Sequence, residues 1–334
     1  MPIYDKVEIG RAAQQYGFVR DTFEKVIRLK EILRFLNEED YLREHLLLKG
    51  GTAINLTVFN LPRLSVDIDM DYTPNDTKED MLVAREKITS LIKEYMETEG
   101  YHLSPSSRFT HSLDAFYYQY QNSGGNKDMI KIELNYSLRA HILEPVQRKI
   151  LPKAFDDGLL IRMVDPIEIF AAKGNALISR AAARDLYDWG NMIAEDLFNN
   201  EKDLFRKCFV FYASISAETI NRNFDTSAID SLKFDKIRRD LFPVLSRKDN
   251  FKLEERKTQA KEYISELMQL TEKENEYLDR FIAKEYVPEL LFNDERMLER
   301  IKDHPMATLK YFYCLAFARL ADLYGLKTPF KCRI

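Results

Sequence analysis

Residues 46–72 of this 334-residue chain read LLLKGGTAINLTVFNLPRLSVDIDMDY, and this stretch carries most of the information about the fold. The apolar run 46–48 predicts a short strand that ends at Gly50-Gly51, and residues 52–59 predict a helix directly after it. Leu61-Pro62 ends that helix. From residue 65 to residue 72 apolar and acidic side chains alternate, as in a strand with two different faces. The sequence therefore predicts a strand, a glycine turn, a short helix and an acidic strand in succession.

The acidic face of the second strand is a candidate metal site. Asp67 and Asp69 lie on the same face, about 6.5–7 Å apart along the strand. Their oxygens can converge on one or two divalent cations, and Mg²⁺ (or Mn²⁺) prefers such ligands together with substrate phosphates. Two ions of this kind can activate an attacking hydroxyl and stabilise a leaving pyrophosphate. On its own, the same alternation is also typical of a solvent-exposed edge strand.

The segment Lys49-Gly50-Gly51-Thr52 lies between the apolar strand and the short helix. Glycines at such a place let backbone N–H groups approach phosphate oxygens, and the helix N-terminus adds a favourable field. A Gly-Gly pair alone is also found in ordinary tight turns. Because the acidic strand follows one short helix later, we predict that Gly50, Gly51 and Thr52 bind a nucleotide.

A third carboxylate is expected from a neighbouring strand. Residues 129–137 alternate again, after a turn at 122–126, and they place Lys131, Glu133 and Asn135 on one face. Glu133 is the candidate third metal ligand and a candidate base. The alternative is a surface strand in which Lys131 and Glu133 form an ion pair. Asp71 is a weaker choice for the third ligand, since it lies near the strand end.

A basic helix is predicted after Asp165-Pro166, which has the pattern of an N-cap followed by proline at the first helical position. If that helix runs unbroken to Asp188, three cations lie within about 40° of one another, namely Lys173, Arg180 and Arg184. Asp188 then lies about 60° from Lys173, and Asp185 is turned about 120° away. Such a stripe can hold a triphosphate. The alternative is an i, i+4 pair between Arg184 and Asp188.

The order of predicted helices and strands along the chain indicates an α+β protein. Residues 1–160 are expected to form a domain with N-terminal helices and a mixed sheet, and residues 161–334 a helical domain that contributes Lys173 and Asp188 to the site. Hydrophobic residues make up 45% and charged residues 31% of the chain, which is typical of a globular protein. No apolar run is long enough to span a membrane, and no signal peptide precedes the first helix, so we expect a cytoplasmic protein. The three cysteines (Cys208, Cys314 and Cys332) match no zinc spacing and are expected to be reduced thiols.

The net charge of −4 argues against a protein that coats nucleic acid by bulk attraction, but it allows a local basic patch. Residues 233–261 are one candidate for such a patch. Basic and acidic residues alternate closely there, which is more typical of a solvent-exposed helix face.

Three blocks in this order resemble the AbiEii/AbiGii toxin family, which includes the mycobacterial MenT-type toxins and falls within the polymerase-β-like nucleotidyltransferase superfamily. The blocks are 48–53, 63–69, and Lys173 with 184–188. The resemblance covers roughly residues 45–190. It implies a polymerase-β-like fold in which Asp67, Asp69 and the two glycines hold metal and nucleotide. It also implies that Lys173 contacts nucleotide phosphates, that Asp188 is the distal acid of the site, and that Arg63 and Ser65 flank the metal site.

The predicted activity is transfer of a nucleotide from an NTP, with Mg²⁺, to an acceptor hydroxyl that attacks the α-phosphate and releases pyrophosphate. Glu133 or Asp67 is the expected base. The resemblance implies the tRNA 3′ end or another RNA as acceptor, growth arrest as the outcome, and a cognate antitoxin as partner. A small molecule or a protein side chain is the alternative acceptor. A nucleotide-binding regulatory module without turnover is the alternative outside the enzymes.

Overall fold

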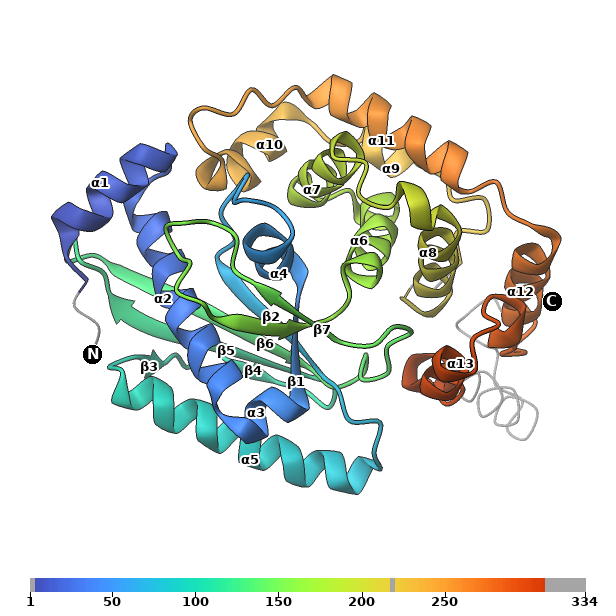
Figure 1. Ribbon diagram of the computed structural model, residues 1–334, viewed down its shortest axis with the longest axis horizontal. Coiled ribbons are helices and arrows are strands. Elements are labelled where there is room, and N and C mark those ends of the chain that lie inside the picture. Colours follow the sequence, from blue (N-terminus) through green and yellow to red (C-terminus); the bar gives the residue numbers. More distant parts are fainter. Residues whose placement is uncertain (1–3, 217–219, 310–334) are drawn as a thin grey trace, which may run out of the picture.

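An eight-stranded mixed sheet lies at the centre of the structure (Figure 1), which is a computed structural model that describes residues 4–216 and 220–309. The sheet has the strand order β3-β5-β6-β2-β1-β8-β7, and β4 pairs with β5. The strands are β1 (Leu46–Lys49), β2 (Asp67–Tyr72), β3 (His102–Leu103), β4 (Arg108–Phe109), β5 (Leu113–Gln121), β6 (Lys127–Asn135), β7 (Val146–Lys149) and β8 (Leu160–Met163). The predicted α+β fold with a mixed sheet is confirmed.

Strand pairing places the acidic residues in the middle of the sheet. β2 runs antiparallel to β1 and parallel to β6. In this register Asp69 lies opposite Lys49 on one side and Glu133 on the other. Paired residues in adjacent strands share a face, so these three side chains lie on the same face of the sheet.

The opposite face of the sheet is covered by α2 (Arg20–Glu38) and α5 (Lys78–Thr98) (Figure 1). Ile68 pairs with Ile132, which pairs with Phe116, and all three side chains are buried. Tyr120 follows on the same face of β5, and its ring lies 4.4 Å from the Arg28 guanidinium of α2. Burial of this apolar face leaves the acidic face free for a site. The other N-terminal helices are α1 (Lys6–Tyr16) and α3 (Asp40–His45).

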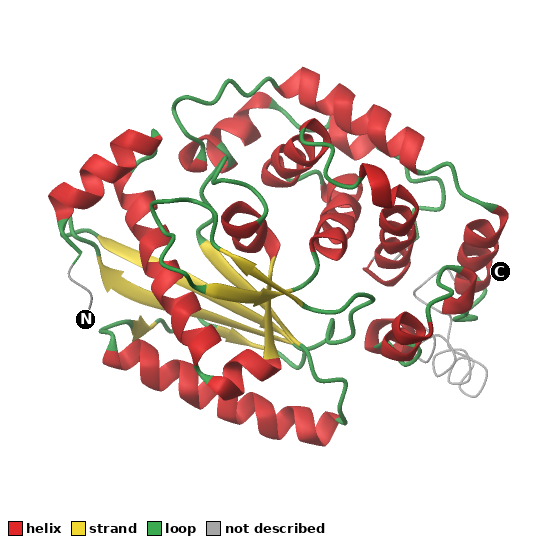
Figure 2. Ribbon diagram, viewed as in Figure 1, coloured by secondary structure: helices red, strands yellow, loops and turns green. Residues whose placement is uncertain are grey.

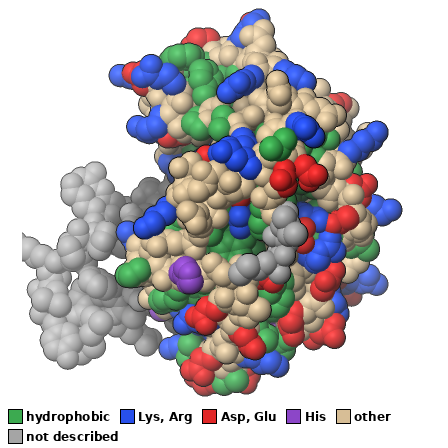
Figure 3. Space-filling model, turned by 90° about the vertical axis from the view of Figure 1, so that its left-hand side faces the viewer, with side chains coloured by type: hydrophobic (Ala, Val, Ile, Leu, Met, Phe, Trp, Pro, Cys, Tyr) green, Lys and Arg blue, Asp and Glu red, His purple; other side chains and the backbone are tan. Residues whose placement is uncertain are grey.

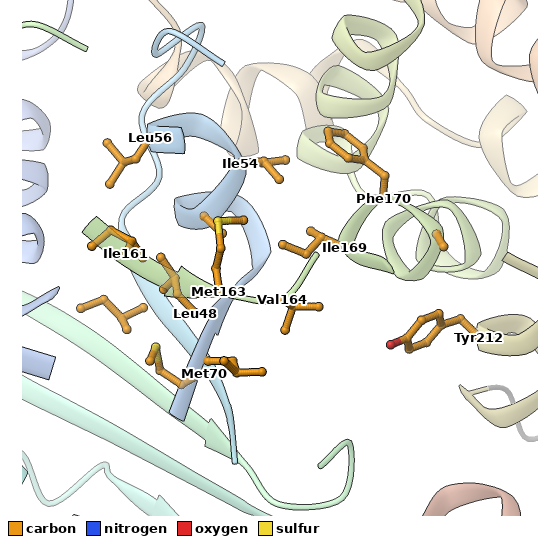
Figure 4. Close-up of a cluster of buried hydrophobic side chains, with 14 of the residues drawn as sticks. Leu48, Ile54, Leu56, Met70, Ile161, Met163, Val164, Ile169, Phe170 and Tyr212 are labelled. Atoms are coloured by element: carbon orange, nitrogen blue, oxygen red, sulfur yellow. The ribbon is translucent and has the colours of Figure 1, made fainter. Parts of the chain in front are cut away.

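The helices that follow the last strand lie together on one side of the molecule (Figure 2), and the short helix between β1 and β2 packs between them and the sheet. A buried cluster joins them to the sheet: Leu48 of β1, Ile54 of α4, Met163 of β8 and Phe170 of α6 lie close together (Figure 4). These helices are α4 (Gly50–Thr57), α6 (Pro166–Arg180), α7 (Ala183–Ala194), α8 (Lys202–Ser216), α9 (Ser227–Asp230), α10 (Phe234–Asp240), α11 (Leu253–Leu267), α12 (Glu272–Ile282) and α13 (Glu295–Ile301).

The prediction of one unbroken helix from residue 166 to residue 188 is wrong. Asp165 caps the helix as expected, accepting a hydrogen bond from the Ile167 N–H at 2.8 Å. α6, however, ends at Arg180, and Ala181 adopts a left-handed conformation with φ of 46°. The Lys236 ammonium of α10 donates a hydrogen bond to the Ala181 carbonyl at 2.9 Å, which satisfies a group exposed by the break. α7 therefore starts in a new direction.

The predictions for the cysteines, for membrane spans and for the domain boundary have different outcomes. Cys208 is a buried free thiol, while Cys314 and Cys332 lie outside the described residues. Among the residues that the structure describes, no helix is long and apolar enough to cross a membrane. The division into domains at residue 160 stays a prediction; β8 extends the sheet to Met163, and helices follow from Pro166.

Candidate active site

A cleft of about 520 Å³ opens on the acidic face of the sheet. The ends of β1 and β2 and the glycine turn form one wall, and α6 and α7 form another. The C-terminal end of α10 adds Asp240 to the rim. The cleft brings together segments that are far apart in the sequence, as expected for a site between a sheet and the helices packed against it.

The glycine turn lies so close to the acidic strand that only residues without a side chain fit there. Gly50 has φ of +71°, and a Cβ atom on it would lie 2.5 Å from Oδ2 of Asp69. A Cβ atom on Gly51 would lie 2.8 Å from both Nη2 of Arg63 and Oγ of Ser65. Side chains at either position would therefore displace the residues that line the cleft.

Asp67 and Asp69 are half-buried at the cleft wall. Burial raises the pKa of Asp69 to about 6; the ammonium of Lys49 opposes this, and the charges of Asp67 and Glu133 add to it. The rise means that the protein groups around Asp69 do not fully compensate its negative charge. A cation bound at this place would supply the missing compensation.

Glu133 and Asp71, the two candidates for a third carboxylate, are already engaged. Glu133 forms an ion pair with Lys131 at 2.7 Å. Asp71 is buried and paired with the Lys49 ammonium, and His141 Nε2 lies 3.8 Å from its carboxylate. Accordingly, within residues 4–216 and 220–309 no group of three or more His, Cys, Asp or Glu side chains is placed to hold a metal ion.

A buried ion network forms the far side of the cleft. Arg63 donates two hydrogen bonds to Asp188, from Nε at 2.7 Å and from Nη2 at 2.6 Å. Lys173 Nζ lies 2.8 Å from Asp185 and 2.9 Å from Asp188. The break between α6 and α7 makes this arrangement possible, because it turns Asp185 toward Lys173.

The charges in this network are mutually compensated. Burial alone would lower the pKa of Lys173, but Asp185 and Asp188 raise it above its ordinary value. Burial alone would raise the pKa of Asp188, but Arg63 and Lys173 lower it below its ordinary value. Lys173 and Asp188 are therefore both ionised near neutral pH, and the buried charges stabilise one another.

Arg184 is a less compensated cation at the cleft wall. Its Nε donates a hydrogen bond to the Asp240 carbonyl at 2.9 Å, and its Nη1 lies 3.9 Å from the Asp67 carboxylate. Burial and the nearby charge of Arg63 lower its pKa. The alternative pairing of Arg184 with Asp188 is not formed, since Asp188 is bonded to Arg63 and Lys173.

The cleft brings together most of the predicted site residues. Eight of them line it: Gly50, Gly51, Arg63, Ser65, Asp67, Asp69, Lys173 and Arg184. Three lie outside the lining, namely Thr52, Glu133 and Asp188. Thr52 is buried, and its hydroxyl donates to the backbone carbonyl of Asp67, so it supports the acidic strand from behind.

Sequence reasoning missed several lining residues: Lys49, Glu168, Asp185, Tyr212 and Asp240. Lys49 follows directly on the apolar strand, so its place beside the glycine turn could have been predicted. The place of Asp185 could not, because three successive alanines at 181–183 favour helix and hide the break. Tyr212 and Asp240 reach the cleft only through the packing of helices later in the chain, whereas Glu168 lies in the first turn of α6, the helix that also carries Lys173.

Comparison with known proteins assigns this chain to a family of nucleotidyltransferases. Residues 34–284 match the family described as nucleotidyl transferase AbiEii toxin, type IV TA system. The chain belongs to this family, and it is thus a nucleotidyltransferase toxin of a type IV toxin–antitoxin system.

Among solved structures, MenT4, a nucleotidyltransferase toxin from Mycobacterium tuberculosis H37Rv, is similar in fold. The TM-score is 0.60 at 17% sequence identity, and the match covers 91% of this chain and 98% of that chain. At this identity the likeness supports the fold alone. No curated protein matches the sequence of this chain.

Proposed function

We propose that the protein transfers a nucleoside monophosphate from an NTP to an RNA acceptor, in the first place the 3′ end of tRNA, with release of pyrophosphate. The observation that carries this proposal is the arrangement of charge in the cleft. Asp67 and Asp69 lie beside a glycine turn, and Lys173 and Arg184 line the same cleft. Such an arrangement suits a triphosphate bound through both a divalent cation and basic side chains.

The residues present fit Mg²⁺ or Mn²⁺. Mg²⁺ is often held by one or two carboxylates together with substrate phosphates and water, and Asp67 and Asp69 supply two. The raised pKa of Asp69 reflects an uncompensated charge that a cation would balance. A cation bound there would contribute positive charge to the phosphates during transfer. Glu133 remains a proposed third ligand, and it would first have to leave Lys131.

The side chains of this chain have distinct proposed roles. The backbone N–H groups of the glycine turn approach the phosphates, and Arg184, whose charge is not fully compensated, binds them directly. Lys173 is held in place by Asp185 and Asp188, and it adds a fixed positive charge. Asp67 is better placed than Glu133 to accept the proton of the acceptor hydroxyl, because Asp67 lines the cleft.

In the proposed reaction, a bond forms between the acceptor oxygen and the α-phosphorus of the NTP. The bond from the α-phosphorus to the oxygen bridging to the β-phosphorus breaks, and pyrophosphate leaves with the electron pair. The proton of the acceptor hydroxyl passes to Asp67. Positioning of the two substrates and electrostatic stabilisation account for most of the rate gain in this kind of chemistry.

The proposal is tested by incubating the purified protein with total tRNA, Mg²⁺ and each labelled NTP in turn. We expect label on tRNA with one or more NTPs, and loss of on the order of 100-fold or more of the rate in Asp69→Asn, because several kcal/mol of charge stabilisation is removed. Asp203→Asn, which alters an exposed carboxylate of α8, is the matched control and should keep the wild-type rate.

Two results would contradict the proposal. Equal labelling by wild type and Asp69→Asn would place the metal site elsewhere. Labelled protein or labelled small molecules, with no label on any RNA, would replace RNA by another acceptor. A cognate antitoxin, expected for the family, would be sought as a protein whose co-expression relieves growth arrest by this chain.

A further inference from the structure

One surface beside the cleft combines exposed aromatic rings with positive charge. Residues 233–248 contain six Lys or Arg and two Asp, a net charge of +4 in a chain whose total is −4. Within this segment Phe234 is 56% exposed and Phe242 is 39% exposed. Figure 3 shows hydrophobic side chains next to lysine and arginine side chains in the upper part of the face it presents.

The two phenylalanines form one feature. Their ring centroids are 5.5 Å apart, and the rings are nearly perpendicular at 82°. Single exposed apolar residues are common on protein surfaces. Here, however, two exposed rings touch each other, one from the first residue of α10 and one from just after its end, and the exposed Arg238 and Arg239 lie between them in the sequence. These four residues are called the α10 rim below.

The α10 rim is fixed to the wall of the cleft. Asp240, which lines the cleft, is bonded to Arg239 at 2.7 Å through its side chain and to Arg184 at 2.9 Å through its carbonyl. Just after Phe242, the Val244 carbonyl accepts a hydrogen bond from the Leu64 N–H at 2.8 Å. The rim is therefore held against the same loop that carries Arg63 and Ser65.

Resting on the proposed function, we propose that the α10 rim binds the single-stranded 3′ segment of the RNA acceptor, with its bases stacked on Phe234 and Phe242 and its phosphates paired with Arg238 and Arg239. Bases stack on exposed aromatic rings without strong sequence preference, and cations beside them follow the backbone. The guanidinium groups now pair with Asp235 and Asp240 at the surface. Exposed ion pairs contribute little to stability, so a phosphate can replace them at small cost.

A binding experiment without NTP tests this proposal apart from turnover. The probe is a single-stranded RNA of about 12 nucleotides, labelled at its 5′ end and with a free 3′ hydroxyl. We expect Phe234→Ala and Phe242→Ala each to raise its Kd by about fivefold to 100-fold. Phe109→Ala is the matched control, because Phe109 is a 50% exposed phenylalanine of β4, and its Kd should stay at the wild-type value.

Salt dependence tests the pairing of phosphates with arginine separately. In Arg238→Gln with Arg239→Gln, the slope of log Kd against log salt should fall by about 0.7 for each phosphate that the protein no longer binds. Arg280→Gln, in another exposed arginine that pairs with carboxylates, should leave the slope unchanged.

Three outcomes are distinguishable. Kd values of all rim variants equal to the wild-type value, or no RNA binding by the wild type, would overturn the inference and leave a protein partner as the occupant to consider. If the rim variants bind RNA more weakly than the wild type and the control variants do not, the α10 rim is supported. This holds even if the wild type transfers no nucleotide, and that absence of transfer would refute the proposed function instead. Normal transfer with unaffected rim variants would leave the function intact and refute the rim.

Discussion

Gly50 shows how a single residue fixes the geometry of the site. Its left-handed backbone brings the turn against Asp69, and no Cβ can be placed there without lying 2.5 Å from the carboxylate. Gly125 has a similar φ of +85°, but nothing lies within 4 Å of a Cβ built on it. Comparing alanine variants at these two positions therefore separates the effect of backbone strain from the effect of crowding Asp69.

We predict that Gly125→Ala lowers the free energy of unfolding by about 1–2 kcal/mol, because alanine is disfavoured in the left-handed region, and that Gly50→Ala lowers it by at least as much, because its Cβ also crowds Asp69. Only Gly50→Ala should also abolish nucleotide transfer, since it displaces Asp69. Chemical denaturation and the labelling assay measure the two effects. Full activity in Gly50→Ala would show that the close approach to Asp69 is dispensable.

Glu168 links three elements at the back of the cleft. The buried carboxylate at the start of α6 accepts hydrogen bonds from the backbone of Ile142 and Leu143, at 2.9 and 2.8 Å, and from the hydroxyl of Tyr212 in α8 at 2.6 Å. Burial raises its pKa to about 7 in spite of these donors. The carboxyl is thus more easily protonated in the folded protein than in the unfolded chain.

This shift predicts a pH-dependent contribution to stability. Because the folded pKa of about 7 lies above the unfolded value of 4.5, the contribution is fully present below pH 4.5 and is lost as the pH rises through 7. The stability difference between wild type and Glu168→Gln should therefore fall by about 2–3 kcal/mol from about pH 5 to about pH 8. Urea denaturation at several pH values measures it.

The wild type has to be compared with Glu168→Gln because other groups change the pH dependence of the free energy of unfolding in the opposite direction. Burial lowers the pKa of His141 to about 3 and that of His304 to about 4. Both histidines take up protons more readily in the unfolded chain, so their contribution to stability rises with pH up to about 6.5. A variant curve parallel to the wild-type curve would show that Glu168 does not titrate in this range.

The whole molecule shows what the sequence reveals and what it hides. Alternation and glycine placement are local signals, so β2, the glycine turn and the position of Asp69 were all predictable. The partner of Arg63 was not, because Asp188 lies 125 residues further along the chain. Nor was the place of the α10 rim at the cleft, since alternating charge at 233–261 fits a solvent-exposed helix equally well.

The Arg63–Asp188 pair joins the loop before the acidic strand to the helices after the sheet. Both side chains are almost completely buried, with 2% and 0% of their surface exposed. Removing one partner of a buried pair leaves an uncompensated charge, which costs about 3–5 kcal/mol. Replacing both partners by apolar residues of similar size is often nearly neutral for stability.

We therefore predict that Asp188→Leu is strongly destabilised, and that adding Arg63→Met restores much of the missing free energy of unfolding, because Lys173 keeps Asp185 as a partner. The double variant should nevertheless be inactive in the labelling assay, since Arg63 lines the cleft and Lys173 no longer has Asp188 as its second carboxylate. Fluorescence of the single tryptophan, buried Trp189, follows unfolding. Equal destabilisation of the single and double variants would mean that hydrogen bonding by Arg63, rather than charge compensation, holds the two parts together.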